Sequence, residues 1–133
     1  MLLHSEFKNQ LQYFSMGLKL WMRAVRAPFF TASIVPVLAG TGFAFYATGS
    51  FNPILFFLVL LGVVFVHGGT NLANDYYDHK SGNDEANKTP TPFSGGSRVI
   101  QDKLIKPHSI LNASLVFFAL GIAIGLYLFY LFG

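Results

Sequence analysis

The chain has 133 residues, of which 53% are hydrophobic and only 11% are charged, whereas a soluble domain carries about 25% charged residues. Its net charge of +3 comes from basic residues confined to two blocks, 8–26 and 80–106, beside apolar segments, so the charge does not indicate a nucleic-acid-binding surface. The absence of cysteine excludes disulfides and thiolate chemistry.

The first predicted element is an amphipathic helix over residues 1–27 that lies in the membrane interface. Apolar residues recur there at spacings of three and four, and the basic residues fall largely on other faces. Trp21 would anchor this helix at the interface. An ordinary soluble helix is the alternative, and the apolar segments that follow argue against it. The stretch has no uninterrupted apolar core of the kind that a cleaved signal peptide needs.

Three membrane-spanning helices are predicted next, within one domain over residues 28–133. No Lys, Arg, Asp or Glu occurs between residues 27 and 74 or after residue 106, and such runs match the roughly 20 residues that cross a bilayer. The predicted order is a span over 28–48, a tight outside turn, a span over 54–75, a polar loop over 78–107 and a span over 109–132. We therefore predict an all-α membrane protein, with an interfacial N-terminal helix and three transmembrane helices.

Two features of these spans bear on packing and orientation. Pro36 is expected to kink the first span, and Gly121 and Gly125 form a G-x-x-x-G pair that would let another helix pack closely in the third. Such glycine pairs are common by chance, so they are a weak signal. The positive-inside rule places both basic blocks, and with them the N-terminus and the polar loop, on the cytoplasmic face.

The end of the second span carries the polar segment NLANDYYDHKSGND, residues 71–84. At about 100° per residue, one face of this helix presents His67, Asn71, Asn74, Asp75 and Asp78. An ionised carboxylate at mid-bilayer costs about 2.5–3.5 kcal/mol on insertion scales, so such a stripe is expected to face a cavity or a partner. One aspartate alone would more simply mark the membrane exit, but the whole stripe favours a site. His67 alone is better explained as a buried hydrogen-bonding residue.

The carboxylates of this stripe favour a bound cation. Asp75 and Asp78, one turn apart, would repel each other by about 3 kcal/mol at an effective dielectric near 20. Either one of them is protonated or a cation lies between them. Oxygen ligands favour a hard cation such as Mg²⁺, which bridges carboxylates to substrate phosphates. Asp84, beyond Gly82 on the loop, either completes the shell of such a metal ion or is only solvated.

Basic residues near this helix end would bind the phosphate groups. Arg26, at the start of the first span, lies at the same level, and its planar guanidinium suits phosphate. Asn74, Lys88 and Arg98 are further candidates for contact with a diphosphate. For the loop residues Lys88, Arg98 and Lys103, placement by the positive-inside rule is the better explanation when each is taken alone.

NLANDYYDHKSGND resembles the first aspartate-rich motif of the UbiA superfamily of intramembrane prenyltransferases, most of all the branch that prenylates 1,4-dihydroxy-2-naphthoate in menaquinone synthesis. RAVRAPFFTASIVPVLAGT is similar to that branch's first span, and SGGSRVIQ resembles the segment before its third. The resemblance implies a UbiA-type helical bundle that transfers a polyprenyl group from its diphosphate to an aromatic acceptor with the help of Mg²⁺. It also implies that Asn71, Asp75 and Asp78 hold the metal ion and that Arg26 neutralises the leaving group.

One departure from that family shapes the expected partners. The chain has three predicted spans and no second aspartate-rich motif. Besides the lipid bilayer, the polyprenyl diphosphate and the acceptor, we therefore expect a missing C-terminal portion or a complementary chain, and no activity from these residues alone. The expected location is a bacterial plasma membrane. Two alternatives stay open: another UbiA branch with a different acceptor, and a non-catalytic membrane protein that binds a prenyl lipid or packs against a partner.

Overall fold

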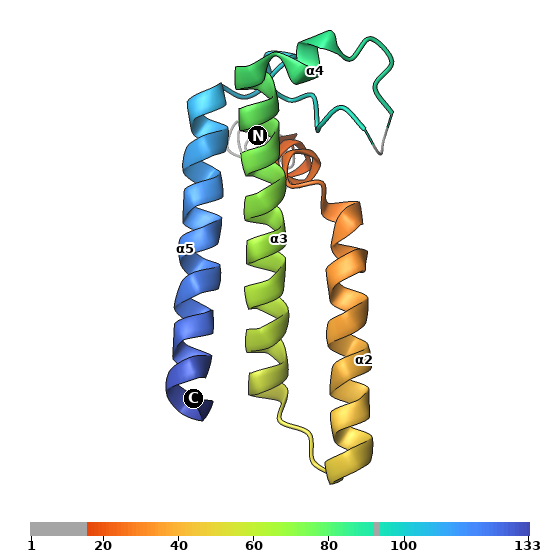
Figure 1. The fold of residues 1–133 in the computed structure, drawn as a ribbon, viewed down its shortest axis with the longest axis vertical. Coiled ribbons are helices and arrows are strands. Elements are labelled where there is room, and N and C mark those ends of the chain that lie inside the picture. Colours follow the sequence, from red (N-terminus) through yellow and green to blue (C-terminus); the bar gives the residue numbers. More distant parts are fainter. Residues whose placement is uncertain (1–15, 92–93) are drawn as a thin grey trace, which may run out of the picture.

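The computed structural model describes residues 16–91 and 94–133. After a helical stretch over residues 16–24, the elements are η1 (Ala27–Phe30), α2 (Thr31–Thr48), α3 (Pro53–Ser81), α4 (Asn83–Ala86) and α5 (Pro107–Phe132). The long helices α2, α3 and α5 run side by side, and the α3–α5 connection crosses over one end of them (Figure 1). All three are long and apolar enough to cross a membrane, which confirms the predicted all-α membrane fold.

The helix boundaries differ from the predicted ones chiefly at the polar motif. α3 continues to Ser81, past residue 78 where the loop was expected to begin, and ends where Gly82 takes a φ of 77°. Residues 71–81 of the motif therefore lie on one continuous helix, whereas Asp84 lies on α4. α2 remains helical through Pro36. Residues 1–15 of the predicted interfacial helix lie outside the described residues, and the placement of that helix in the interface stays a prediction.

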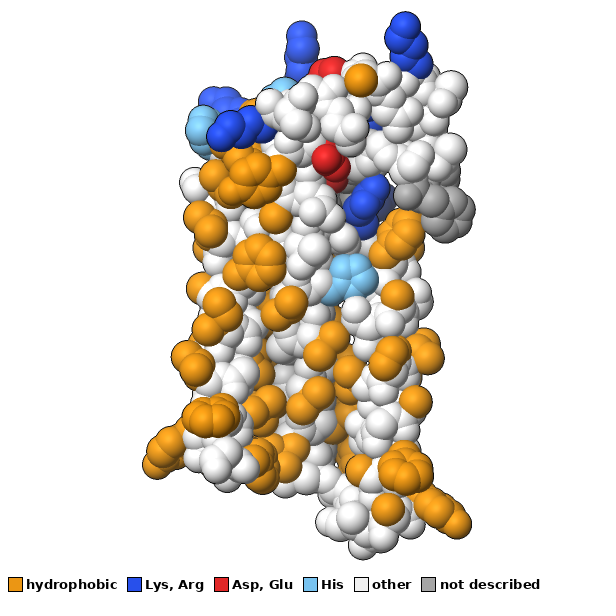
Figure 2. Space-filling view, viewed as in Figure 1, with side chains coloured by type: hydrophobic (Ala, Val, Ile, Leu, Met, Phe, Trp, Pro, Cys, Tyr) orange, Lys and Arg blue, Asp and Glu red, His pale blue; other side chains and the backbone are white. Residues whose placement is uncertain are grey.

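The buried core lies at the polar end of the bundle. Its side chains come from the N-terminal segment (residues 16–26), α3, the long loop between α4 and α5 (residues 87–106) and α5: Ala24, Val25, Leu72, Val99, Ile100 and Ile110. Elsewhere the long helices expose many large apolar side chains, which Figure 2 shows as an apolar surface over most of their length. Lipid or further helices are the surroundings that such a surface requires.

Glycines let α3 and α5 approach each other closely. A Cβ atom on Gly121 would lie 2.7 Å from Cγ2 of Val66 and 3.4 Å from the carbonyl oxygen of Gly62. A Cβ on Gly125 would meet no other atom within 4 Å. Only the first glycine of the G-x-x-x-G pair therefore serves helix packing among the described residues.

Candidate functional site

Asp75 is held at the polar end of α3 by a residue from the distant loop. Its side chain is 2% exposed. The main-chain N–H of Ser97 donates to both carboxylate oxygens, at 3.1 and 3.2 Å, and the Ser97 hydroxyl donates to one of them as well. The loop before α5 thus folds back over the helix end and sets the orientation of this carboxylate.

Gly96 brings a second carboxylate next to the first. A Cβ atom at Gly96 would lie 2.9 Å from Oδ1 of Asp75 and 2.8 Å from Oδ2 of Asp84. Its φ of 69° also favours glycine. Since Asp84 is only 1% exposed, the alternative that it is merely solvated is wrong. Asp75 and Asp84 therefore flank one glycine of the loop, an arrangement that a side chain there would block.

The carboxylates at this end of the bundle repel one another. Burial raises the pKa of Asp84, and the negative charges of Asp78 and Asp75 raise it further, against the opposing charge of Arg98. Asp84 also accepts a hydrogen bond from Nε2 of Gln101 at 3.3 Å, and Asp78 accepts one from Nδ2 of Asn83 at 3.4 Å. A cation among these groups would relieve the repulsion that their burial creates.

Arg26 lies beside this acidic group. It takes a left-handed backbone conformation with φ 55° just before η1, and its guanidinium lies over the ring of Phe29, 5.6 Å from the centroid. The guanidinium is within electrostatic range of the Asp75 carboxylate. In Figure 2 one acidic, one basic and one histidine side chain follow one another down an otherwise mostly apolar face.

The other predicted site residues are placed differently. Asn71 is buried, and its Nδ2 donates to the carbonyl oxygen of Val25 at 2.9 Å, which ties α3 to the N-terminal segment. Asn74 and Lys88 are exposed. Arg98 donates from Nη1 to the main-chain carbonyl of Asp84 at 2.6 Å. Within residues 16–91 and 94–133, no hydrogen bond or ion pair joins Lys88 to the carboxylates.

Two residues at this site were missed by the sequence analysis. Ser97 lies within the quoted SGGSRVIQ segment, so the glycine pair before it was the available signal. Arg23 carried no signal beyond its charge. Its Nε donates to the Ser97 carbonyl at 2.9 Å and its Nη2 pairs with Asp102 at 2.5 Å. Arg23 therefore ties Ser97, the loop residue that holds Asp75, to the N-terminal helix.

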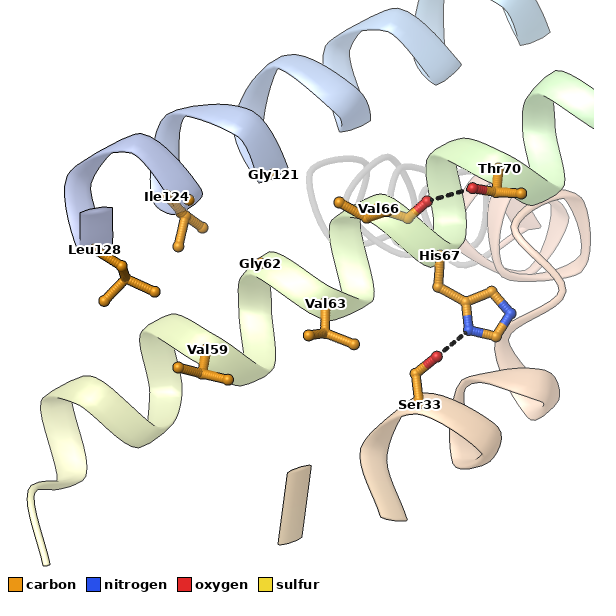
Figure 3. Close-up of a pocket in the computed structure, with 11 residues that line it drawn as sticks. Ser33, Val59, Gly62, Val63, Val66, His67, Thr70, Gly121, Ile124 and Leu128 are labelled. Carbon is orange, nitrogen blue, oxygen red and sulfur yellow. Dashed lines mark hydrogen bonds between the residues drawn. The ribbon is translucent and has the colours of Figure 1, made fainter. Parts of the chain in front are cut away.

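An apolar cavity of about 470 Å³ opens along α3, and residues of α2 and α5 on either side of that helix complete its lining (Figure 3). Most of its lining is aliphatic or glycine: Val59, Gly62, Val63, Val66, Gly121, Ile124, Gly125 and Leu128. Its polar residues are Ser33, His67 and Thr70. His67 is half-buried, and its Nδ1 shares a hydrogen bond with the Ser33 hydroxyl at 2.7 Å, which agrees with the hydrogen-bonding role predicted for it.

The donors at the polar end fit a magnesium ion in chemical type. Within the described part of the chain, no three His, Cys, Asp or Glu side chains converge closely enough to hold a metal ion by themselves. Magnesium, however, is characteristically bound by one or two carboxylates together with substrate phosphates. Asp75 and Asp84, on either side of Gly96, could supply two such carboxylates.

Comparison with known proteins adds a family relationship. The model of the UbiA prenyltransferase family matches residues 33–133. The chain is 34% identical over 114 residues to 1,4-dihydroxy-2-naphthoate octaprenyltransferase of Bacillus subtilis, covering 86% of this chain and 34% of that protein. It is 28% identical over 117 residues to UbiA prenyltransferase domain-containing protein 1 of Xenopus tropicalis, covering 88% and 30%.

A third relative, 2-carboxy-1,4-naphthoquinone phytyltransferase of Synechocystis, is 33% identical over 66 residues, which cover 50% of this chain and 22% of that protein. The chain thus spans about a third or less of the length of these relatives. No solved structure gave a significant match.

Proposed function

Because the chain belongs to the UbiA prenyltransferase family, we propose that it forms part of an enzyme that transfers a polyprenyl group from its diphosphate to an aromatic acceptor. The observation that carries this proposal is the buried pair Asp75 and Asp84 on either side of Gly96, in a bundle that also holds an apolar cavity. A polyprenyl diphosphate has the matching composition, with a highly charged head and a long apolar tail. The cavity would take part of the tail and the polar end would take the head.

In this proposal the carboxylates act through a cation that they share with the substrate. Asp75 and Asp84, with Asp78 next to them, would hold Mg²⁺, and Ser97 would keep the Asp75 carboxylate in place. When bound, Mg²⁺ would neutralise charge that develops on the departing diphosphate. Asn71 donates from Nδ2 to the Val25 carbonyl, which leaves its Oδ1 free to act as the predicted ligand of Mg²⁺. The same hydrogen bond would position the start of the first span against α3.

Arg26 would bind the diphosphate through its guanidinium. Charge builds on the diphosphate oxygens as the allylic C–O bond breaks, and a fixed cation nearby stabilises that charge more than it stabilises the ground state. The stacking of Arg26 over Phe29 and its nearness to Asp75 support this role. The electron-rich ring of the acceptor would then attack the allylic carbon, and the ring would lose a proton.

The apolar cavity would also protect the reaction. An allylic cation that meets water is hydrolysed, so the region in which it forms must exclude solvent. The aliphatic and glycine lining of the cavity supports such exclusion. Its enclosure would be completed by the portion of the family fold that lies beyond these three spans, on the same or a complementary chain. We further propose that the polar end faces the cytoplasm, because the basic blocks lie there.

The proposed acceptor is 1,4-dihydroxy-2-naphthoate, as named for the Bacillus subtilis relative, with menaquinone synthesis as the pathway. A different acceptor within the family is the second candidate, favoured by the likeness to 2-carboxy-1,4-naphthoquinone phytyltransferase of Synechocystis. Both acceptors require the same diphosphate chemistry at Asp75, so the site residues alone do not separate them.

The test is transfer of a radiolabelled prenyl group in membranes that contain this chain and the complementary portion of a family member. We expect naphthoate-dependent product that requires Mg²⁺. Asp75→Asn should lower the rate by about a hundredfold or more, as does loss of a group that stabilises developing charge. The control is Asp102→Asn, an exposed carboxylate, which should leave the rate within about twofold. Product from another aromatic acceptor alone would favour the second candidate. The absence of product from any acceptor would contradict the proposed transfer and favour a non-catalytic protein that binds a prenyl lipid.

A further inference from the structure

A second cavity, of about 580 Å³, lies between the end of α3, the long loop and the start of α5. Six of its nine lining residues fall into two chemical types. Arg98, Lys103 and Lys106 are basic, while Ile100, Ile105 and Pro107 are apolar. Of these six residues only Arg98 contacts the carboxylate site, through its bond to the Asp84 carbonyl. The cavity is therefore next to the proposed diphosphate site but is built mainly from other residues.

The charges of this cavity are unbalanced. Its one carboxylate, Glu85, is already engaged by Nδ1 of His79 at 2.5 Å and by Nε2 of Gln101 at 3.4 Å. Lys103 and Lys106 are exposed, and neither side chain forms an ion pair or a hydrogen bond with any residue that the structure describes. The cavity thus offers cationic groups that have no anion of the chain to neutralise them.

The backbone holds two of these basic residues in an unusual conformation. Arg98 has φ 64° and Lys103 has φ 58°, a region that residues with a Cβ atom rarely adopt. The turn between them is held by hydrogen bonds from the N–H of Lys103 to the Ile100 carbonyl and from the N–H of Leu104 to the Val99 carbonyl, both 2.9 Å. The positive-inside rule explains why basic residues occur in this loop, but it does not explain the left-handed backbone conformation of Arg98 and Lys103. Such outliers tend to occur at ligand sites.

We propose that this cavity binds the phosphate group of an anionic membrane lipid. Lysine and arginine are the phosphate-binding side chains of proteins. Pro107 begins α5, a helix long and apolar enough to cross a membrane, so the cavity would lie where that helix enters the bilayer, at the depth of lipid headgroups. Ile100, Ile105 and Pro107 would contact the glycerol and the first methylene groups of the lipid. A free phosphate ion would use the basic residues alone and would gain nothing from this apolar part.

The test measures lipid retention by the full 133-residue chain, purified in detergent, using native mass spectrometry. The probes are phosphatidylglycerol, phosphatidylcholine and inorganic phosphate. We expect an apparent Kd for phosphatidylglycerol at least about fivefold below that for phosphatidylcholine, the size of effect that one basic residue at a membrane surface exerts. The double variant Lys103→Gln/Lys106→Gln should remove this preference. The matched control is Lys19→Gln/Lys80→Gln, which changes the same charge at two exposed lysines outside the cavity.

Each other outcome overturns the proposal. If the control variant loses the preference as fully as the cavity variant, the attraction is a general surface effect. If the cavity variant keeps the preference, the lipid binds elsewhere or not selectively. If inorganic phosphate displaces the lipid at equal concentration, the cavity is a site for a free anion. Should circular dichroism show that the double variant has lost helix, Lys103→Gly replaces it, because glycine readily takes the φ of this position. None of these readouts depends on prenyl transfer.

Discussion

Ser97 binds the Asp75 carboxylate with its main-chain N–H and its hydroxyl, although the two residues belong to different segments, 22 positions apart. The contact fixes the direction of a carboxylate that is 2% exposed. It also joins the long loop to α3 at the point where the polar end and the apolar spans meet. The behaviour of the site should therefore depend on the loop as much as on the aspartates.

Removal of the Ser97 hydroxyl should lower the magnesium affinity of the site without unfolding the helical bundle. In Ser97→Ala the main-chain N–H remains, but the hydroxyl no longer holds Asp75. Loss of a group that orients a metal ligand typically costs about 10–100-fold in metal affinity or activity. Magnesium titration of the purified protein measures the change, and Ser109→Ala, at an exposed serine in the first turn of α5, is the control. Equal affinity in both variants would contradict an orienting role for Ser97.

Gly96→Ala should disrupt the approach of the two carboxylates. The new Cβ would lie under 3 Å from oxygens of Asp75 and Asp84, at a φ of 69° that disfavours alanine. The strained backbone alone costs about 1–3 kcal/mol. We expect a lower Tm in detergent and loss of magnesium binding. Gly40→Ala, within α2 where a Cβ meets nothing within 4 Å, should keep magnesium binding and should not lower the Tm, because alanine favours a helix over glycine, so a similar loss there would refute the local explanation.

Arg23→Gln should loosen the loop more than removal of its ion-pair partner does. The variant loses the bond to the Ser97 carbonyl as well as the pair with Asp102, whereas Asp102→Asn loses only the pair. An exposed ion pair contributes about 1 kcal/mol or less. Hydrogen exchange at residues 96–99 should become faster in Arg23→Gln and stay close to wild type in Asp102→Asn. Equal exchange in the two variants would show that the carbonyl contact does not hold the loop.

The raised pKa of Asp84 predicts a pH dependence with a definite sign. Burial and the nearby carboxylates raise this pKa above its usual 3.8, so the folded protein holds a proton that the unfolded chain has already released. Without metal, the contribution of Asp84 to stability should fall as pH rises from the usual value through the raised one. Magnesium needs the ionised form, so its affinity should fall as pH is lowered through the raised pKa.

Calorimetric magnesium titration across a pH series tests this sign. The wild-type protein should show an affinity that rises with pH. Asp84→Asn carries no titrating group at this position, so its weaker affinity should vary less over the same range. An affinity that rises as pH falls would be incompatible with competition between a proton and the metal ion at Asp84.

Some of the site could be predicted because it depends on local periodicity. Asn71, Asp75 and Asp78 share a helix face through the repeat of the α-helix alone, and the apolar runs set the number and the approximate length of the spans. The positions of Ser97, Gly96 and Arg23 could not be predicted in this way. They contact Asp75 or one another across intervals of up to 74 residues, and no periodicity specifies such contacts.

The amino-acid sequence by itself determined that this is an all-α membrane protein with a polar stripe at the end of its second span, because hydrophobicity and helical period act over neighbouring residues. The tertiary structure alone decided that Asp84 is buried beside Asp75, that Gly121 packs against α3 while Gly125 does not, and that Ser97 orients the central carboxylate. The burial of Asp84 and the orientation of Asp75 follow from how the loop closes over the helix ends, and the contact of Gly121 follows from the packing of α5 on α3. Loop closure depends on contacts between segments that the chain brings together only when it folds.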